Sequence, residues 1–351
     1  MMVPVIFTIL CLSIFFVSDL SSAFVLGELI FRLSRNLLLV MSLVIPVITG
    51  LGLNFGIVLG AMAGQIGIIF ILNYGIGGIG GVFLAMLVST PVAILFGYLV
   101  GKVLNRAKGK EMITSMILGF FANGIWQLVF IVMAGSIIPI RNTALLVPEG
   151  IGLKNTLGLE SIKQVLDKWI FGDIFPKIPI MTFVVTLLFF LLVYFVLKTK
   201  LGQNMKAVGQ DMNVARISGI NVDKTRITAI IFSTVLAAWG QIIFLQNIGT
   251  FNTHTNHEQV GLFSVAALLI GGASINKASW KEVIIGTILF HTLFIISPIA
   301  GQKIVGNAQM GEYFRVFVAY GVIGISLLMH AWESNSGKKS KKLKTVDVEK
   351  A

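Results

Sequence analysis

Apolar runs about twenty residues long recur along almost the whole chain, and this feature constrains its fold most. In lipid, a chain can satisfy its backbone polar groups only as a helix or a closed barrel, and a spanning helix needs about 20 apolar residues. Of the 351 residues, 56% are hydrophobic and only 12% are charged. The sequence therefore predicts an all-α polytopic membrane protein. The ten predicted spans are residues 3–20, 36–53, 55–74, 80–101, 112–135, 179–197, 227–248, 261–275, 283–300 and 312–332.

The placement of basic residues predicts the orientation of these spans. Lysines and arginines gather in alternate loops, at 102–110, 198–226 and 277–281, and in the tail after Gly337. Cytoplasmic loops of membrane proteins carry this excess, so both termini are predicted to be cytoplasmic. Residues 1–335 then form one transmembrane domain with a long outer loop at 136–178, and residues 336–351 form a disordered basic tail. The net charge of +12 follows from this sorting and from contact with the lipid bilayer, and it does not require nucleic acid.

The N-terminal apolar run has a second interpretation. Residues 3–17 are followed by Ser21-Ser22-Ala23, a small-residue pattern that is also typical of a cleaved secretory signal. The positively charged segment that should precede such a signal is missing, so a retained first span is favoured. Cys11 is the only cysteine, which excludes an intrachain disulfide and a multi-cysteine metal site.

A long basic segment separates the predicted spans 179–197 and 227–248. Its sequence, residues 198–226, is KTKLGQNMKAVGQDMNVARISGINVDKTR. Asp211 can cap a short helix over 212–218, Gly219 can end that helix in a left-handed conformation, and Asp223 can help to open the next span. On charge alone the segment is either a solvated loop that fixes topology or a docking helix for a cytoplasmic partner.

This segment resembles the cytoplasmic coupling loop of bacterial ATP-binding-cassette (ABC) importer permeases, in the family that carries branched-chain amino acids, simple sugars of the ribose type and nucleosides. The positions that match the family's spacing are Ala207, Gly209, Asp211, Arg216, Ser218, Gly219, Ile220, Asn221, Val222, Asp223 and Lys224, continued by Leu236, Ala237 and Gly240. The segment 269–274, LIGGAS, is similar to a second family signature, and 52–56, GLNFG, to a first Gly-rich turn. The chain departs from the family at Asn213-Val214, where an Ala pair is common, and at Lys277-Ala278, where glycines are usual.

The resemblance implies a set of partners and a coupling site. The partners are a cytoplasmic ABC ATPase subunit, a second permease chain that is identical or related, and an external solute-binding protein, in a bacterial plasma (inner) membrane. The residues that would couple to the ATPase are Gly209, Asp211, Ala215, Arg216, Gly219 and Ile220. ATP and Mg would bind the partner ATPase, and the chain itself would carry no cofactor.

Two Gly-rich turns look like variations on one plan. The residues concerned are Gly52, Asn54 and Gly56 in the first turn and Gly271, Gly272 and Ser274 in the second. Each turn follows a predicted span on the cytoplasmic side, which indicates two related halves. Small residues that allow close helix packing in lipid are the alternative explanation for any single glycine.

Sequence motifs for catalysis are missing. There is no G-x-x-x-x-G-K-[ST] phosphate cradle, no His-Glu-x-x-His zinc motif and no Gly-x-Ser-x-Gly nucleophile, so the chain is predicted not to be an enzyme and to hold no metal. His254 and His257 are interpreted as part of a solvated outer loop. Paired intramembrane carboxylates are also lacking, which weighs against an ion-driven carrier.

Uncharged polar residues at membrane depth are the candidates for a translocation path. Asn123 and Gln127 lie four apart on one predicted helix face beside Trp126, and Gln65 and Gln241 lie in other spans. Amides and an aromatic ring suit a neutral, hydroxyl-rich or heterocyclic solute. Hydrogen bonds between helices are the alternative role for each of them.

The lack of fixed charge at mid-membrane favours a simple sugar or a nucleoside as the solute. A branched-chain amino acid is the alternative, because the pairs Gln210-Asp211 and Ala215-Arg216 resemble that subgroup. A passive channel or scaffold that needs no ATPase is an alternative from a different class.

Overall fold

The chain is mainly helical in the computed structural model, which describes residues 2–148, 150–171, 178–275, 277–307, 309–317, 320–321, 324–325 and 328. The α-helices are α1 Met2–Ser18, α2 Ser22–Ser42, α3 Val44–Ile48, α4 Ile57–Asn73, α5 Gly78–Arg106, α6 Glu111–Gln127, α7 Val165–Phe171, α8 Ile180–Lys198, α9 Lys200–Gln210, α10 Met212–Ile217, α11 Val222–Ile248, α12 Asn256–Ile270 and α13 Trp280–Val305. A π-helical stretch, Leu128–Met133, extends α6, and a 3₁₀ turn covers Thr143–Leu145. Strands β1 Thr156–Gly158 and β2 Thr250–Asn252 form a two-stranded antiparallel sheet.

The described residues include six helical segments that are long and apolar enough to cross a membrane. They are Ser22–Ile48, Gly78–Arg106, Glu111–Met133, Ile180–Lys198, Val222–Ile248 and Trp280–Val305. The prediction of an all-α polytopic membrane protein is therefore confirmed. Helices α1, α4 and α12 are shorter, so the count of ten spans and the two related halves stay predictions.

The structure corrects two predicted boundaries near the ends of spans. Residues 21–35 were expected to lie outside the spans, but α2 begins at Ser22, where the Ser21 hydroxyl caps the helix by accepting from the Phe24 amide. Two arginines within this stretch lower its hydropathy, which hides the helix from a hydropathy argument. Helix α12 occupies 256–270 where 261–275 was expected. The predicted tail 336–351 and most of the predicted span 312–332 lie outside the described residues.

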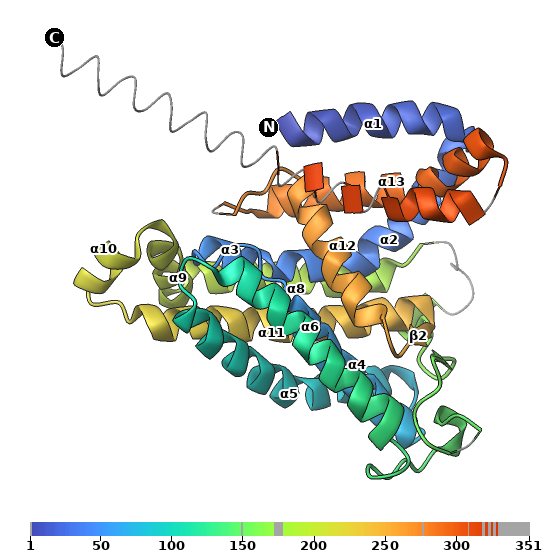
Figure 1. Ribbon diagram of the computed structural model, residues 1–351, viewed down its shortest axis with the longest axis horizontal. Coiled ribbons are helices and arrows are strands. Elements are labelled where there is room, and N and C mark those ends of the chain that lie inside the picture. The colour runs from blue at the N-terminus through green and yellow to red at the C-terminus, as the bar shows by residue number, and fades with distance from the viewer. Residues whose placement is uncertain are drawn as a thin grey trace.

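The segments between helices gather at two ends of the bundle (Figure 1). The first, which we call the basic end, contains α9, α10, the turn 50–56 and the loop 107–110. Lys108 Nζ lies 2.7 Å from Asp223 Oδ1 there. The second, which we call the sheet end, contains β1, β2 and the segment 134–171. Its parts are tied together by the pairing of Leu157 with Phe251 and by a 2.7 Å bond from the Arg141 amide to Asn73 Oδ1.

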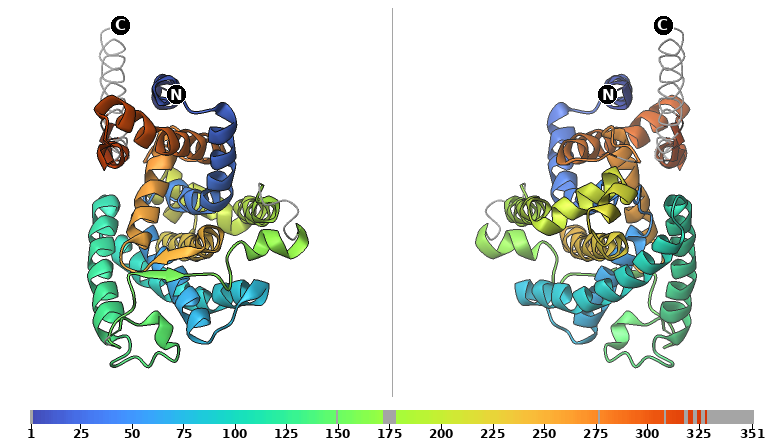
Figure 2. Two further views of the ribbon diagram at one scale, coloured as in Figure 1. Left: turned by 90° about the vertical axis from the view of Figure 1, so that its right-hand side faces the viewer. Right: turned by 90° about the vertical axis from the view of Figure 1, so that its left-hand side faces the viewer.

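Helix α11 lies at the centre of the bundle and packs against α2, α4 and α5 (Figure 2). Small residues on the neighbouring helices allow these close approaches. A Cβ atom at Gly97 of α5 would lie 2.7 Å from the Cα atom of Ile231 in α11. Close packing of this kind through small residues is how helices associate in lipid, where no hydrophobic effect drives them together.

Candidate functional site

A buried polar network lies where α12 begins, at the sheet end of the bundle. The side chain of His257 is 0% exposed. Its Nδ1 atom lies 3.1 Å from Gln65 Oε1 on α4, and its Nε2 atom lies 2.9 Å from Asn123 Oδ1 on α6. The neighbouring Asn256 side chain accepts from the amides of Gln65 and Gln241. One turn of α12 thus joins α4, α6 and α11 through side-chain hydrogen bonds.

Four of the five residues predicted for a translocation path meet in or beside this network. Gln65, Asn123 and Gln241 belong to it, and the Trp126 ring centroid lies 5.1 Å from that of His257. The Trp126 indole donates to the Thr253 carbonyl oxygen over 2.7 Å. The fifth residue, Gln127, is exposed.

His257 itself was misplaced by the sequence argument. It was expected in a solvated loop, but it is fully buried because α12 begins at Asn256 and directs the imidazole between α4 and α6. Glu258 was also overlooked, although its carboxylate accepts from the Asn123 amide. A signal was available in the sequence, since three polar residues, 256–258, directly precede an apolar run and can form the first turn of the same helix.

We expect replacement of Asn123 by leucine to destabilise the protein more than the same change at Gln127. Asn123→Leu removes contacts to His257 and Glu258, and bonds of this kind contribute about 1–2 kcal/mol together in a membrane. Gln127→Leu, four residues along the same helix, changes an exposed side chain and should shift stability by less than about 0.5 kcal/mol. Denaturant unfolding in micelles measures both, and equal losses would contradict the network.

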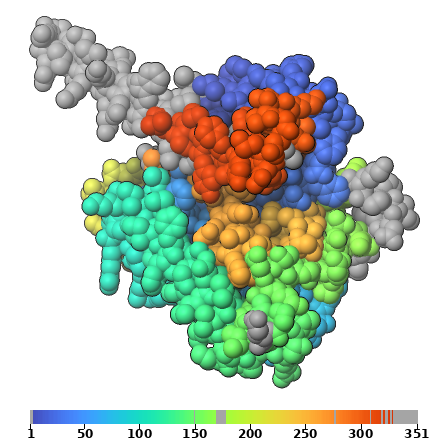
Figure 3. All heavy atoms as spheres, turned by 45° about the vertical axis from the view of Figure 1, so that its right-hand side comes forward, coloured from blue at the N-terminus to red at the C-terminus, as the bar shows by residue number. Residues whose placement is uncertain are grey.

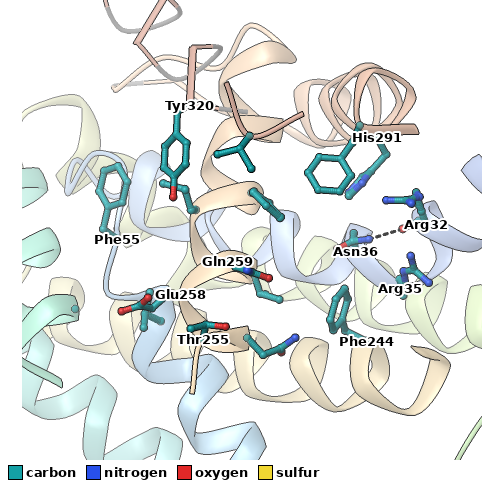
Figure 4. A pocket seen from close by; sticks show the side chains of 18 of the residues that line it. Arg32, Arg35, Asn36, Phe55, Phe244, Thr255, Glu258, Gln259, His291 and Tyr320 are labelled. Atoms are coloured by element: carbon teal, nitrogen blue, oxygen red, sulfur yellow. Dashed lines mark hydrogen bonds between the residues drawn. The ribbon is translucent and has the colours of Figure 1, made fainter. Parts of the chain in front are cut away.

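A cavity of about 750 Å³ opens beside the network, with walls from α2, α6, α11, α12, α13 and the segment after α13. In the space-filling view, α6 and residues 309–317 flank α12 on this face (Figure 3). Thr255, Glu258 and Gln259 line one side of the cavity (Figure 4). Arg32, Arg35, Asn36 and His291 line the other.

The two arginines correct the expectation that no fixed charge lies at membrane depth. Arg32 and Arg35 lie in the interior of α2, within the candidate span Ser22–Ile48. Because residues 21–35 were placed outside the spans, the sequence argument counted both side chains as external. The argument from charge that favoured a neutral solute therefore does not hold for this cavity.

The predicted docking helix is present at the basic end as α10. Asp211 Oδ1 accepts from the amides of Asn213 and Val214 at 2.7 and 3.0 Å, which caps the helix as expected. Gly219 has φ +80°, so it ends the helix in the left-handed region that favours glycine. Helix α11 is capped by Asn221, and Asp223 lies in its first turn.

Helix α10 has one anchored face and one exposed face. Ala215 is buried against Val208 and Val222. Val214 and Ile217 are 60% and 88% exposed, and Arg216 is exposed between them. Two apolar side chains and a cation displayed on a rigid, capped helix form a surface that suits a protein partner.

A buried ion pair lies beneath α10. Arg226 Nη2 lies 2.6 Å from Glu111 Oε1, and the two side chains are 0% and 10% exposed. Arg226 Nη1 also lies 3.0 Å from the sulfur of Met212. This guanidinium therefore connects α10, the start of α11 and the start of α6.

The Gly-rich turns pack against each other and against α9. A Cβ atom at Gly52, which has φ +71°, would lie 3.1 Å from the Ile275 side chain of the second turn. Asn54 Oδ1 accepts from the Gly56 amide at 2.9 Å and holds the first turn before α4. Gly272 has φ +89°, whereas Gly271 is in the right-handed region. The amide of Ser274 donates to the Lys277 carbonyl at 2.8 Å, which closes the second turn.

Gly209 of α9 supports the first turn from the other side. Its Cα atom lies so close to Ile48 and Gly50 that a Cβ atom would collide with the Ile48 carbonyl oxygen. In the part of the chain that the structure describes, no group of three or more His, Cys, Asp or Glu side chains could hold a metal ion. The features described here are thus the exposed helix α10, a pair of Gly-rich turns, a polar network and a cavity.

Comparison with known proteins gives one family and several partial relatives. A family model described as "Branched-chain amino acid transport system / permease component" matches residues 25–327. The xylose transport system permease protein XylH of Haemophilus influenzae is 29% identical over 164 residues, which is 46% of this chain and 40% of that protein. The nucleoside ABC transporter permease protein NupC of Lactococcus lactis is 29% identical over 130 residues, 36% of this chain and 38% of that protein.

A third relative covers more of the chain. The fructose import permease protein FruG of Bifidobacterium longum is 24% identical over 243 residues, which is 68% of this chain and 64% of that protein. The chain spans about half the length, or less, of the first relatives that it matches. No solved structure matches.

Proposed function

Because this chain belongs to the family of branched-chain amino acid transport system permease components, we propose that it is the membrane-spanning permease subunit of an ATP-driven ABC importer. The observation that carries the proposal is α10, a capped helix that exposes Val214, Arg216 and Ile217 at the basic end. The chain is then a transport subunit rather than an enzyme, and its orientation puts both termini and the basic end in the cytoplasm.

The proposed complex has three kinds of component. Two permease chains, identical or related and each with ten spans, enclose a path through the inner membrane. A cytoplasmic ABC ATPase receives α10 in a surface groove and binds ATP and Mg. A solute-binding protein delivers solute to the sheet end. Closure of the ATPase would move α10, and the ion pair of Arg226 with Glu111 would carry that movement to α6 and α11.

For the solute, we propose a simple sugar or a nucleoside. The names of three relatives support this class, since they are permeases for xylose, fructose and nucleosides. The family description names branched-chain amino acids, which stay the alternative. Stimulation of ATP hydrolysis by binding proteins loaded with ribose, a nucleoside or leucine would separate the classes, and stimulation by leucine alone would overturn the preference.

We expect changes to α10 to uncouple the permease from its ATPase. Arg216→Glu reverses the exposed charge, and Gly219→Val forces a β-branched residue into the left-handed region. Both variants should lose copurification with the partner ATPase and ATP-dependent uptake in proteoliposomes. Lys154→Glu is the matched control for copurification with the ATPase, because it reverses an exposed charge at the sheet end, away from α10. If both α10 variants keep association and uptake, a passive channel or scaffold becomes the better account.

A further inference from the structure

The arginine side of the cavity holds more positive charge than the carboxylates around it neutralise. Arg32 Nε is 3.8 Å from Glu28 Oε2, and Arg315, in the segment after α13, pairs with Glu312. Arg35 differs from both. Among the described residues, no carboxylate lies within 4.0 Å of the Arg35 guanidinium. Its one side-chain hydrogen bond among these residues is a long contact of 3.4 Å, from Nη1 to Asn247 Oδ1.

Several donors on this side have no hydrogen-bond partner among the described residues. The Nε atoms of Arg32, Arg35 and Arg315 are buried without a hydrogen bond among the described residues. An unpaired charge at membrane depth is costly, and ionisable residues inside a membrane mark binding sites and solute paths. Such a site is completed when a ligand supplies the missing negative charge.

Aromatic rings fix where these guanidinium groups lie. Arg32 Cζ and Arg315 Cζ lie 5.4 and 4.7 Å from the centroid of the Phe294 ring. Arg35 Cζ lies 5.8 Å from the centroid of the Phe244 ring. Stacking on a ring holds a planar guanidinium while its N–H groups stay available. A planar fork of N–H donors matches a carboxylate or a phosphate, which can accept two bonds from one arginine.

The other side of the cavity offers hydrogen bonds without a positive charge. Thr255 and Gln259 lie there with Glu258, across the cavity from the arginines (Figure 4). An acid at this side repels an anion and so favours one orientation of a ligand. An α-amino acid fits poorly, because its two charged groups are bonded to the same carbon atom, whereas the cavity carries its own charges on opposite sides. The volume of about 750 Å³ is that of a site for a small molecule.

We propose that this cavity binds a hydroxylated solute through a carboxylate or phosphate group held by Arg35 and Arg32, with its hydroxyl groups toward Thr255 and Gln259. Sugar acids, sugar phosphates and nucleoside monophosphates have this chemistry. The inference rests on the proposed function, and it narrows the solute from the sugar and nucleoside class to anionic members of it. An anionic lipid offers the same phosphate group, so the test separates the two sources.

The test measures binding to the full chain in nanodiscs of phosphatidylcholine. The probes are ribose 5-phosphate, glucuronate and inorganic phosphate, with ribose and glucose as neutral counterparts, and the readout is titration calorimetry. An anionic sugar probe should bind the natural chain at least about tenfold more tightly than its neutral counterpart, because hydrogen bonds to charged groups are the stronger ones. Arg35→Gln should remove this difference, and Arg35→Lys should keep part of it.

Controls make the outcome decisive. Arg141→Gln removes an exposed arginine at the sheet end and should leave the preference unchanged. Thermal unfolding without probe confirms that each variant is folded. If phosphatidylglycerol in the discs stabilises the natural chain but not Arg35→Gln, while no soluble probe discriminates, the site holds a lipid headgroup and the solute proposal is overturned.

If no probe and no lipid shows an effect that depends on Arg35, the solute proposal is also overturned. Copurification with the ATPase is measured on the same variants. If the chain still copurifies with the ATPase although no anionic probe binds, only the proposed anion site has failed, and the proposed importer stands.

Discussion

Replacing Arg226 with methionine is expected to lower the free energy of unfolding by about 3–5 kcal/mol, because removing one partner of a buried ion pair leaves the other charge unpaired. Arg226 is fully buried, and Glu111 is its one carboxylate partner in the part of the chain that the structure describes. Glu111→Gln should also destabilise the protein, since a charged guanidinium then faces a neutral amide. Unfolding in micelles, followed by tryptophan fluorescence, measures each loss.

The exposed pair at the same end of the bundle is the control. Lys108 and Asp223 are 2.7 Å apart, but their side chains are 35% and 60% exposed. Solvent screens such a pair, so Lys108→Met should cost only about 0–1 kcal/mol. The double variant Arg226→Met, Glu111→Leu should recover part of the loss, because it removes both buried charges. Equal losses from Arg226→Met and Lys108→Met would show that burial of the pair does not govern its contribution.

Features that depend on neighbours in the sequence were predictable. The helix over 212–217 follows from Asp211 as a cap and Gly219 as a left-handed terminator, and both roles are seen. Five predicted spans match observed helices because hydropathy is a property of a local window. Of the residues placed at membrane depth, Gln65, Asn123 and Gln241 share one network, whereas Gln127 is exposed, and their role in a translocation path stays a prediction.

Features that depend on distant partners were not predictable from the sequence. Glu111 directly follows the basic segment 102–110, and nothing near it in the sequence indicates that it pairs with Arg226, 115 positions away. The sequence argument missed the interior of α2 as part of a span for a related reason. A hydropathy argument penalises Arg32 and Arg35 as if lipid surrounded them, whereas Phe294 and Phe244 and a cavity receive their guanidinium groups.

Addition of one methyl group at Gly209 is expected to separate α9 from the first Gly-rich turn. A Cβ atom there would overlap the carbonyl oxygen of Ile48 and lie 3.1 Å from the amide nitrogen of Gly50. These are backbone atoms, which cannot rotate away as a side chain can, so α9 must move off α3. Overpacking of this kind costs about 1–3 kcal/mol in the folded state.

The consequence for transport should exceed the consequence for stability. In the proposed importer, movement of α10 would reach the turn at 50–56 through α9, and Gly209→Ala would loosen that contact. ATP-dependent uptake should therefore fall at least about tenfold, while the proposed association with the ATPase through the intact α10 should persist. Gly124→Ala is the matched control, because nothing lies within 4 Å of a Cβ atom there and alanine favours a helix by about 0.5–1 kcal/mol over glycine. Uptake and unfolding are measured on both variants in the same proteoliposome and micelle preparations. Uptake of Gly209→Ala at the level of Gly124→Ala would show that the contact between α9 and the turn does not transmit movement, and would place transmission in the Arg226 ion pair alone.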